Sequence, residues 1–283
     1  MPSSAPRACI IGHPVAQSRS PMLHGHWLEM LGIAGSYDRQ DVPPEALEAF
    51  FARFAAAGYV GGNITLPHKT AIIPLLAGID DAARIIGAVN TIWLENGSFI
   101  GGNSDWRGFM DNLDDRAPGW DKGAEEVVVL GAGGAARAVI YGMLQRGASV
   151  HIVNRTREAA ETLAQHFGAR VKAHGWEALP ALLPRADLLA NTTALGMLGK
   201  PAMVIDLAPL KPGATVADAV YVPLETDLLK AAKARGHQTV DGLGMLLHQA
   251  AFGFRHWFGG NPQVTPALRA LVEADIRAKT PGA

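Results

Sequence analysis

The stretch of sequence that decides the fold is Val127-Val128-Val129-Leu130-Gly131-Ala132-Gly133-Gly134-Ala135-Ala136-Arg137. Its first four residues are apolar and predict a buried strand, and residues 134–145 continue with the periodicity of a helix. The glycines allow a sharp turn and let a phosphate group approach the backbone amides at the start of the helix. This context predicts a nucleotide-binding turn rather than a purely structural one, with ligand contacts from Gly131, Ala132, Gly133, Gly134 and Ala135.

The end of the next expected strand, residues 149–153, indicates which dinucleotide binds. A site for NAD usually places Asp or Glu about 20 residues after the first glycine, where it accepts hydrogen bonds from the ribose. This chain instead has Asn154-Arg155-Thr156-Arg157. No carboxylate is present to repel a 2′-phosphate, and two guanidinium groups are available to bind one. The sequence therefore predicts NADP; the alternative is that Arg155 and Arg157 are solvated loop charges.

Strands alternate with helices on both sides of this turn. Such alternation predicts an α/β fold with parallel sheets covered by helices. With 283 residues, the chain suits two domains better than one core. In the first hundred residues, helices are expected over 20–31, 45–57 and 68–77, and Asn96-Gly97 between apolar runs predicts a hairpin.

Composition limits the classes of partner. Hydrophobic residues make up 48% and charged residues 18%, which is typical of soluble globular proteins. The net charge of -1 gives no reason to expect nucleic acid or a membrane surface as partner. No apolar stretch has the length of a membrane span or the position of a signal peptide. The single cysteine, Cys9, is expected to be a buried strand residue, and its lack of a partner in the chain suits the cytoplasm.

Four motifs in the first half hold polar residues at the ends of apolar strands. Hydroxyls, amides, one ammonium and one carboxylate at such positions suit a compact polyhydroxylated acid as ligand. The motifs are residues 12–21 (GHPVAQSRSP), 61–69 (GGNITLPHK), 87–91 (GAVNT) and 102–105 (GNSD).

These four motifs, in this order, resemble the substrate-binding domain of shikimate dehydrogenases. The resemblance runs from about residue 8 to residue 260 and continues, after the glycine turn and the Asn-Arg-Thr motif, with residues 191–193 (NTT), 218–223 (DAVYVP) and 241–249 (DGLGMLLHQ). It implies two α/β domains flanking a cleft: a substrate domain over 1–107, a Rossmann-type NADP-binding domain over 108–242, and C-terminal helices, 243–283, that return to the first. The implied reaction is reversible hydride transfer between NADP and shikimate, which yields 3-dehydroshikimate, in chorismate and aromatic amino-acid biosynthesis.

The resemblance also implies roles for single residues. Ser18 and Ser20 would hold the substrate carboxylate, and Gly242 and the backbone at Ala219 would lie near the nicotinamide. Lys69 and Asp105 would flank the reacting oxygen. Further contacts with the carboxylate or the ring hydroxyls are implied for Asn63, Thr65, Asn90, Tyr221 and Gln249.

The chemistry agrees with a joint role for Lys69 and Asp105. Hydride delivery to a ketone builds negative charge on oxygen, so a proton donor must stand within hydrogen-bond reach. A lysine beside an aspartate can hold charge, donate a proton and regain it, and the two share that task. Taken alone, Lys69 would be read as an exposed charge and Asp105 as a helix N-cap.

Four positions depart from the family pattern. Many relatives carry Asp at the position of Gly102, Thr at that of Ser104 and a small residue at that of Trp106. The second basic residue of the phosphate clamp usually stands where this chain has Ala159, and Arg157 is expected to replace it.

Other classes of function are less well supported. His24 and His26 lie two apart on an expected helix, so they point to different faces, and no metal site is predicted. The ligands are therefore small molecules, and the chain is expected to be a monomer or a homodimer. Two alternatives remain: a relative that also uses quinate or NAD, and a catalytically silent NADP-binding sensor. A sensor does not need both Lys69 and Asp105.

Overall fold

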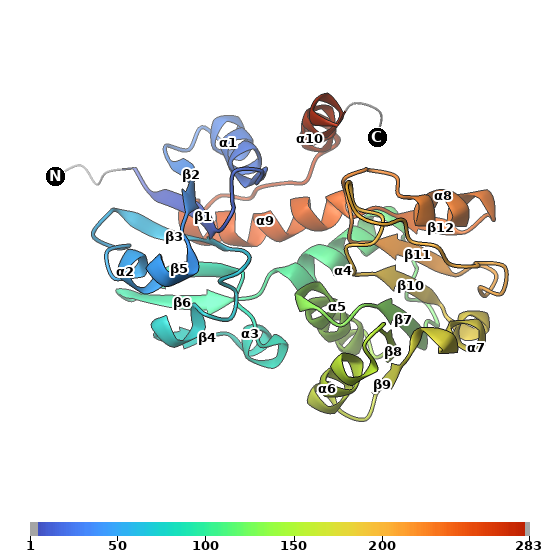
Figure 1. Cartoon of the computed structure of the whole chain (residues 1–283). Helices are drawn as coiled ribbons and strands as arrows, with labels where there is room; N and C mark the ends of the chain where they lie inside the picture. Colours follow the sequence, from blue (N-terminus) through green and yellow to red (C-terminus); the bar gives the residue numbers. More distant parts are fainter. Residues whose placement is uncertain (1–4, 281–283) are drawn as a thin grey trace. The chain divides into compact units, whose positions relative to one another are not determined.

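The computed structural model describes residues 5–280. The chain divides into two compact units, which Figure 1 allows the reader to follow by colour. The first unit contains the chain up to Ser104 together with Gln249–Val272, and the second contains Asp105–His248 together with the chain from Glu273. Each unit is described by itself below.

The second unit is built on a six-stranded sheet in the order β12-β11-β10-β7-β8-β9. Every neighbouring pair is parallel. This order, with the first strand in the middle, is that of a doubly wound dinucleotide-binding sheet. The strands are β7 (Glu126–Leu130), β8 (Ser149–Val153), β9 (Val171–His174), β10 (Leu188–Asn191), β11 (Thr215–Asp218) and β12 (Gln238–Val240).

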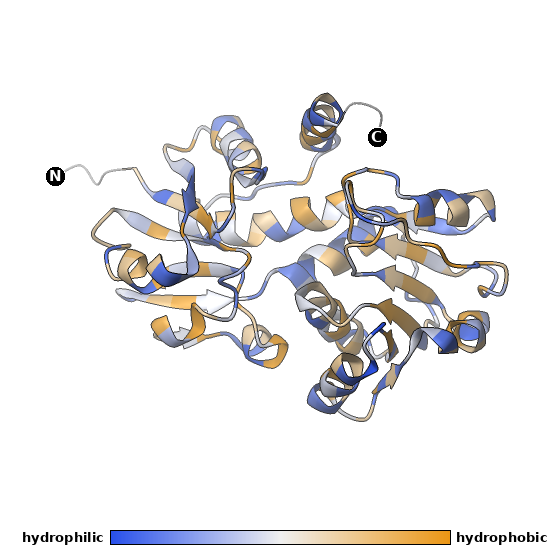
Figure 2. Ribbon diagram, in the orientation of Figure 1, coloured by the Kyte–Doolittle hydropathy of each residue, from blue (hydrophilic) through white to orange (hydrophobic). Residues whose placement is uncertain are grey.

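Two apolar clusters cover the two faces of this sheet. Val127 and Val129 belong to one cluster, and Val128 and Leu130 to the other, and none is more than 1% exposed. A strand buried on both faces needs apolar residues at successive positions, which explains the unbroken run in β7. Figure 2 shows the same hydrophobic colour along β10 and β11.

Helices cover both faces of the sheet and complete the two clusters. One face is packed by α4 (Asp105–Arg116), α5 (Gly134–Gln145) and α6 (Arg157–Phe167). The other is packed by α7 (Leu179–Leu182) and α8 (Asp227–Ala234).

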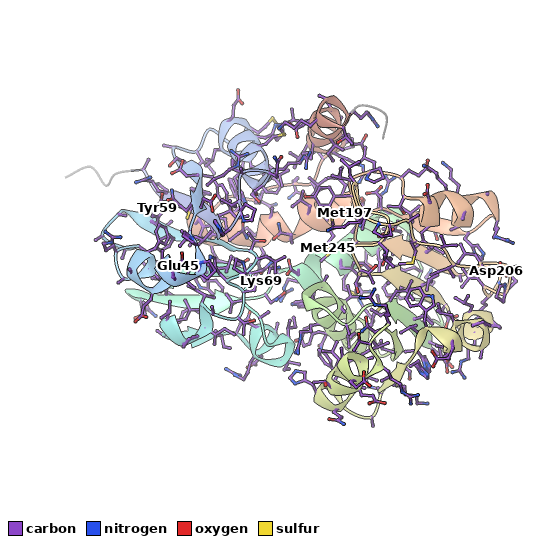
Figure 3. All side chains as sticks on the ribbon, in the orientation of Figure 1. Glu45, Tyr59, Lys69, Met197, Asp206 and Met245 are labelled. Atoms are coloured by element: carbon purple, nitrogen blue, oxygen red, sulfur yellow. The ribbon has the colours of Figure 1, made fainter. Side chains whose placement is uncertain are left out.

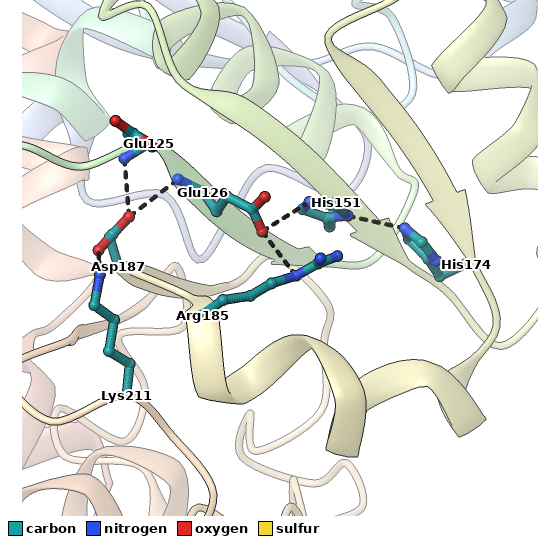
Figure 4. A network of polar contacts seen from close by, with 7 residues as sticks. All are labelled: Glu125, Glu126, His151, His174, Arg185, Asp187 and Lys211. Carbon is teal, nitrogen blue, oxygen red and sulfur yellow. Dashed lines mark hydrogen bonds and ion pairs between the residues drawn. The ribbon is translucent and has the colours of Figure 1, made fainter.

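A polar network links the start of β7 with Asp187, the residue before β10, and with Lys211 in the loop before β11 (Figure 4). Asp187 accepts hydrogen bonds from the backbone N–H groups of Glu125 and Glu126, at 2.8 and 3.0 Å, and pairs with Lys211. Burial raises the pKa of Asp187, but the hydrogen bonds from Lys211 and from the two amides outweigh burial and lower it. The network thus fixes the start of β7 with a carboxylate that remains ionised.

The first unit contains a mixed six-stranded sheet in the order β2-β1-β3-β5-β6-β4. β2, β1 and β3 are parallel, and β5 runs antiparallel to both of its neighbours. The turn between β5 and β6 has left-handed φ values at Asn96 and Gly97, so the predicted hairpin is confirmed. The strands are β1 (Arg7–Gly12), β2 (Ser36–Asp41), β3 (Tyr59–Ile64), β4 (Gly78–Ile79), β5 (Thr91–Glu95) and β6 (Ser98–Gly102).

The remaining α-helices are α1 (Ser20–Met30), α2 (Leu47–Phe51), α3 (Asp81–Ile86), α9 (Leu243–Phe258) and α10 (Pro266–Lys279). Within the first unit, Trp257 packs against β3, where Gly61 has no side chain to obstruct the indole. The indole N–H donates to the carbonyl of Ile92 at 2.8 Å. Cys9 lies in β1 and is 0% exposed, which confirms the buried position expected for it.

Two helices expected from the sequence are shorter or absent. Residues 68–77 form turns and one short 3-10 helix, Ile73–Leu75, so the helix expected there is wrong. Pro74 has no N–H to donate. The carbonyl of Lys69 accepts from the N–H of Val89 at 2.8 Å, so it is not available for a helical hydrogen bond. The expected helix over 45–57 is reduced to a 3-10 helix, Pro44–Ala46, followed by α2.

Among residues 5–280, no helix combines the length and the apolar character that a membrane span requires. The same part of the chain brings together no group of three or more His, Cys, Asp and Glu side chains in a metal-binding arrangement.

His24 is a fully buried histidine inside an aromatic cluster of the first unit. Its ring stacks on Tyr37, with centroids 4.0 Å apart, and lies 5.3 Å from Trp257 and 6.0 Å from Phe254. Neither ring nitrogen has a hydrogen-bond partner among the described residues. Burial therefore lowers the pKa of His24 to about 3.

This depressed pKa predicts a pH-dependent stability. The unfolded chain binds a proton at His24 below about pH 6.5 and the folded chain does not, so stability present above pH 6.5 is lost as the pH falls toward 3. When the pH is lowered from 7.5 to 5.5, the unfolding free energy should fall in both proteins, but by about 1.4 kcal/mol less in His24→Phe than in the parent. Urea unfolding at both pH values measures this, with His26→Phe on the same helix as control. Equal losses in parent and His24→Phe would contradict the assignment.

Candidate functional site

The turn after β7 is built around Gly131. Its φ of +104° is one that residues with side chains rarely adopt, and a Cβ here would lie 2.9 Å from Thr193 Cγ2 and 3.0 Å from Thr192 Oγ1. The N–H of Gly131 donates to the carbonyl of Val153 at 2.8 Å, which joins the ends of β7 and β8. Glycine is therefore required by both the backbone angle and the lack of space.

The start of α5 leaves room for an anion. Gly133 is the N-cap with an extended backbone, no side chain caps the helix, and its first turn contains no acidic residue. A Cβ on Gly133 or Gly134 would meet no atom within 4 Å. Amides at a helix N-terminus with open space beside them are suited to the pyrophosphate of a dinucleotide, so this turn fits the predicted cofactor.

A cavity of about 340 Å³ lies at the ends of β8 and β10. Its lining includes two cations and no carboxylate, so it is suited to a negatively charged group. The Asn154 side chain donates to the carbonyl of Thr156 at 2.8 Å and holds the loop after β8 in place. The cavity is lined by Asn154, Arg155, Thr156, Trp176, Thr193, Ala194, Leu195, Lys200 and Pro201.

The two arginines of this loop have different surroundings. Arg155 lines the cavity, whereas Arg157 is the first residue of α6 and its Nε lies 2.9 Å from Glu161 Oε1. Ala159 is exposed on the same helix. The second cation that lines the cavity is Lys200, which the sequence analysis missed. The sequence feature that could have indicated it is a lysine between two turn-forming residues, Gly199 and Pro201, in the loop that follows β10.

The loop after β11 brings Ala219 and Gly242 together. A Cβ on Gly242 would lie 2.3 Å from the carbonyl oxygen of Ala219. Asp218, at the end of β11, holds this loop by accepting from Val220 N–H at 2.9 Å and from Thr226 Oγ1 at 2.7 Å. Tyr221 follows in the same loop and is half-buried. Burial raises the pKa of Asp218 to about 6, although the hydrogen bonds it accepts oppose that shift.

In the first unit, a buried cluster joins Asn90, Ser104 and Gln249. Asn90 Nδ2 donates to Ser104 Oγ at 3.0 Å and to Gln249 Oε1 at 3.5 Å, and Ser104 N–H donates to Asn90 Oδ1 at 2.7 Å. Ser104 Oγ donates to Gln249 Oε1 at 3.3 Å. The Ser104 hydroxyl, a group that threonine would also supply, thus links two side chains predicted to contact substrate.

Asn63 belongs to the same polar region of the first unit. It is 4% exposed at the end of β3. Tyr37, a residue that the sequence analysis passed over, donates to Asn63 Oδ1 at 2.6 Å, and Asn63 Nδ2 donates to the carbonyl of Asn90 at 3.3 Å. Thr65 follows in the next turn and is half-buried, and its N–H donates to the carbonyl of Ile11 at 2.9 Å.

Ser18 and Ser20 lie together at the start of α1. Their Oγ atoms are 3.2 Å apart, and Ser20 N–H donates to Ser18 Oγ at 3.3 Å. Arg39 from β2 donates to the Ser18 carbonyl through Nη2 at 2.6 Å and so holds the loop. Two hydroxyls at a helix N-terminus are a suitable receptor for a carboxylate.

Lys69 and Asp105 both follow strands of the first unit's sheet, β3 and β6, although Asp105 is itself the first residue of the second unit. Lys69, labelled in Figure 3, is half-buried in the turns that follow β3 of the first unit. Asp105 is the first residue of α4 in the second unit and is half-buried as well. Lys69 therefore lies shortly after the end of β3, and Asp105 shortly after the end of β6.

Two of the departures have a structural explanation. A Cβ on Gly102 would lie 2.6 Å from Asp80 Oδ2 and 2.9 Å from the Trp93 ring, so no side chain fits there. Trp106 packs edge-to-face on Tyr141 of α5, with centroids 5.2 Å apart, and joins the apolar cluster of the second unit.

The fold and these sites define a two-unit α/β protein with a dinucleotide-binding unit of the dehydrogenase type. Three family models match successive parts of the chain: the shikimate dehydrogenase substrate binding domain over residues 10–92, shikimate / quinate 5-dehydrogenase over 118–208, and the shikimate 5′-dehydrogenase C-terminal domain over 242–272. The chain belongs to the shikimate dehydrogenase family, as its motifs predicted.

Named relatives agree with this assignment. Shikimate dehydrogenase (NADP(+)) of Azorhizobium caulinodans is 58% identical over 96% of this chain and 98% of its own. The structure of shikimate 5-dehydrogenase from Thermus thermophilus in complex with NADP(H) and shikimate has a TM-score of 0.84 at 35% identity, covering 96% of this chain and 99% of that one. Quinate dehydrogenase from Corynebacterium glutamicum in complex with NAD has a TM-score of 0.87 at 31% identity, covering 95% and 99%. The predicted fold class is confirmed.

The glycine turn yields a matched pair of predictions. Gly131→Ala should lower the unfolding free energy by about 1–3 kcal/mol, because the backbone angle and the two threonines leave no place for the methyl group. Gly133→Ala should scarcely change stability, since its φ of −89° is ordinary, but its methyl group would enter the space beside the α5 amides and weaken NADP binding. Thermal unfolding and calorimetric titration with NADP separate the two effects. Parental NADP affinity in Gly133→Ala would show that the ligand does not approach this turn.

Proposed function

We propose that this chain is an NADP-dependent shikimate dehydrogenase, which catalyses the reversible reduction of 3-dehydroshikimate to shikimate in chorismate and aromatic amino-acid biosynthesis. The observation that carries the proposal is that a member of this family has a cation-lined cavity in one unit and a buried cluster of amides and hydroxyls in the other. The relatives named above support it, since they are named for NADP and shikimate.

The substrate is a polyhydroxylated carboxylic acid, and the first unit offers groups for both of its functions. Ser18 and Ser20 bind the carboxylate at the start of α1. Contacts with the carboxylate or the ring hydroxyls are proposed for Asn63, Thr65, Asn90, Gln249 and Tyr221. Amides that are already held by buried hydrogen bonds lose little freedom on binding, and a site built to pair hydroxyls rejects analogues that lack them.

The cofactor is held by the second unit. The amides of the turn from Gly131 to Ala135 bind the pyrophosphate, and Asn154, Arg155 and Thr156 bind the ribose phosphate. Arg157, which does not line the cavity and pairs with Glu161, contributes its charge only from the start of α6. Ala219 and Gly242 contact the nicotinamide through their backbone. NADPH supplies the hydride when it is bound.

Lys69 and Asp105 handle the proton that accompanies hydride transfer. The lysine ammonium stabilises the negative charge that develops on the substrate oxygen, and the pair together supplies the proton that this oxygen receives. Neither residue is the sole acid or base, because the two share this task and act as a unit.

The proposed domain boundaries separate most of the residues that bind substrate from those that bind NADP. We assign residues 1–107 to the substrate-binding and catalytic domain and residues 108–242 to the NADP-binding domain. Of the segment 243–283, expected to return to the first domain, Gln249–Val272 belongs to the first unit and the part of α10 from Glu273 to the second. We further propose a cytoplasmic location, because a biosynthetic enzyme with one buried thiol needs no oxidising compartment, and a monomer or homodimer as the active form.

The test of the proposal is a matrix of shikimate and quinate against NADP and NAD, followed by absorbance of the reduced nicotinamide. The highest kcat/KM is expected for shikimate with NADP. Comparable rates with quinate or NAD would support the relaxed enzyme, an alternative favoured by the likeness to the quinate dehydrogenase. Binding of NADP without reduction of it by either substrate would support a silent sensor.

The catalytic roles predict strong losses of turnover. Lys69→Met keeps the apolar stem but removes charge and proton, so kcat should fall by about two to four decades with little change in substrate affinity. Asp105→Asn should also lower kcat strongly, and the double variant should be scarcely worse than the poorer single one. Steady-state kinetics measures each, with Lys230→Met, an exposed lysine of α8, as control. Near-parental turnover in folded Lys69→Met that still binds NADP would refute the mechanism.

A further inference from the structure

Lys200 stands on a loop with a well-defined backbone. The N–H of Gly196 donates to the carbonyl of Pro201 at 2.8 Å, and the N–H of Lys200 donates to the carbonyl of Met197 at 2.9 Å. Gly196 and Gly199 both have left-handed φ values, which lets the chain reverse direction within these few residues. The position of Lys200 therefore follows from the turn itself.

The base of the same loop is held by a buried amide. Asn191 is 0% exposed; its Oδ1 accepts from the N–H of Thr193 at 2.9 Å and from the Thr193 hydroxyl at 2.8 Å. Its Nδ2 donates to the carbonyl of Leu195 at 3.2 Å. Thr193 and Leu195 line the cavity, so the wall that carries Lys200 is anchored in the sheet.

The charge in this cavity is not compensated. Lys200 and Arg155 are both exposed, and within residues 5–280 neither forms an ion pair with a carboxylate. No acidic side chain lines the cavity. Arg157, the other cation of the motif, is already paired with Glu161. Two cations facing one cavity without an acid point to an anionic group of the ligand.

The position of the cavity indicates which anionic group that is. Arg155 and Thr156 follow β8, where dinucleotide-binding sheets read the substituent on the adenosine ribose. None of residues 131–135, whose amides suit the pyrophosphate, lines the cavity. A volume of about 340 Å³ also falls in the range of small-molecule sites, roughly 300–1,000 Å³.

We propose that Lys200 is the second cation of the 2′-phosphate site and determines, with Arg155, the preference for NADP over NAD. The lysine takes the place of the basic residue expected on α6, where this chain has Ala159. Arg155 offers a planar fork to two phosphate oxygens, and the Lys200 ammonium adds a compact charge from the opposite loop. This inference rests on the proposed use of NADP.

The test uses adenosine 2′,5′-bisphosphate and 5′-AMP as probes, because they differ only in the 2′-phosphate. By calorimetry on the full chain, Lys200→Gln should lose about tenfold or more in affinity for the bisphosphate and scarcely change its affinity for AMP. Lys200→Arg should recover most of the loss, since it keeps the charge. Lys230→Gln, which removes one positive charge elsewhere in the same unit, is the control. In kinetics, Lys200→Gln should raise the KM for NADP while kcat and the KM for NAD stay near parental values.

Each outcome decides one question. Parental affinity of Lys200→Gln for the bisphosphate would overturn the role of Lys200, and so would an equal loss for both probes, which would indicate a merely structural contribution. Arg155→Gln measured beside it shows whether the bisphosphate enters this cavity at all. If the parent binds AMP as tightly as the bisphosphate, the proposed preference for NADP fails, whatever Lys200 does. Thermal unfolding of each variant confirms that the protein is folded.

Discussion

The hydrogen bond between Asn191 Nδ2 and Asp218 Oδ1, 2.9 Å long and buried, joins the ends of two neighbouring strands, β10 and β11. Both loops of the nucleotide-binding unit that follow these strands depend on it. On one side, the Asn191 amide organises the residues that line the cation-lined cavity. On the other, the Asp218 carboxylate holds the segment that brings Ala219 to Gly242. A desolvated carboxylate is stable here because three donors reach it, and losing one of them would leave an unsatisfied buried acceptor.

The first unit applies the same principle to a different ligand. Its polar side chains at strand ends are mostly neutral amides and hydroxyls, paired with one another rather than with charges. Neutral groups pay a smaller desolvation penalty than ions, so they can remain buried and still exchange partners when a hydroxylated ligand enters. The charged groups of this region, by contrast, lie in turns and at helix starts, where water has access before the ligand binds.

How much could be predicted from the sequence depended on how local the physical cause was. β7 and the turn after it were predictable, because a strand buried on both faces leaves an unbroken apolar run and Gly131 has no substitute. β9 was missed because an edge strand with Lys172 and His174 has no apolar pattern. The helix expected over 68–77 failed because a distant amide, that of Val89, takes up the Lys69 carbonyl. Lys200 could not be foreseen, since only the folded loop brings it to the cavity that Arg155 lines.

The burial of the single thiol of the chain, Cys9, makes its reactivity depend on opening of the structure. Cys9 is 0% exposed in β1, and burial raises the pKa of its thiol well above the ordinary value, so the folded protein presents almost no thiolate to a reagent. Alkylation of Cys9 must therefore wait for β1 to open. The rate of alkylation then reports the lowest-energy opening that exposes β1, local or global, and is blind to opening confined to the second unit, which contains no cysteine. If the opening free energy obtained in this way is smaller than the free energy of global unfolding, the first unit opens locally, and this comparison needs no engineered label.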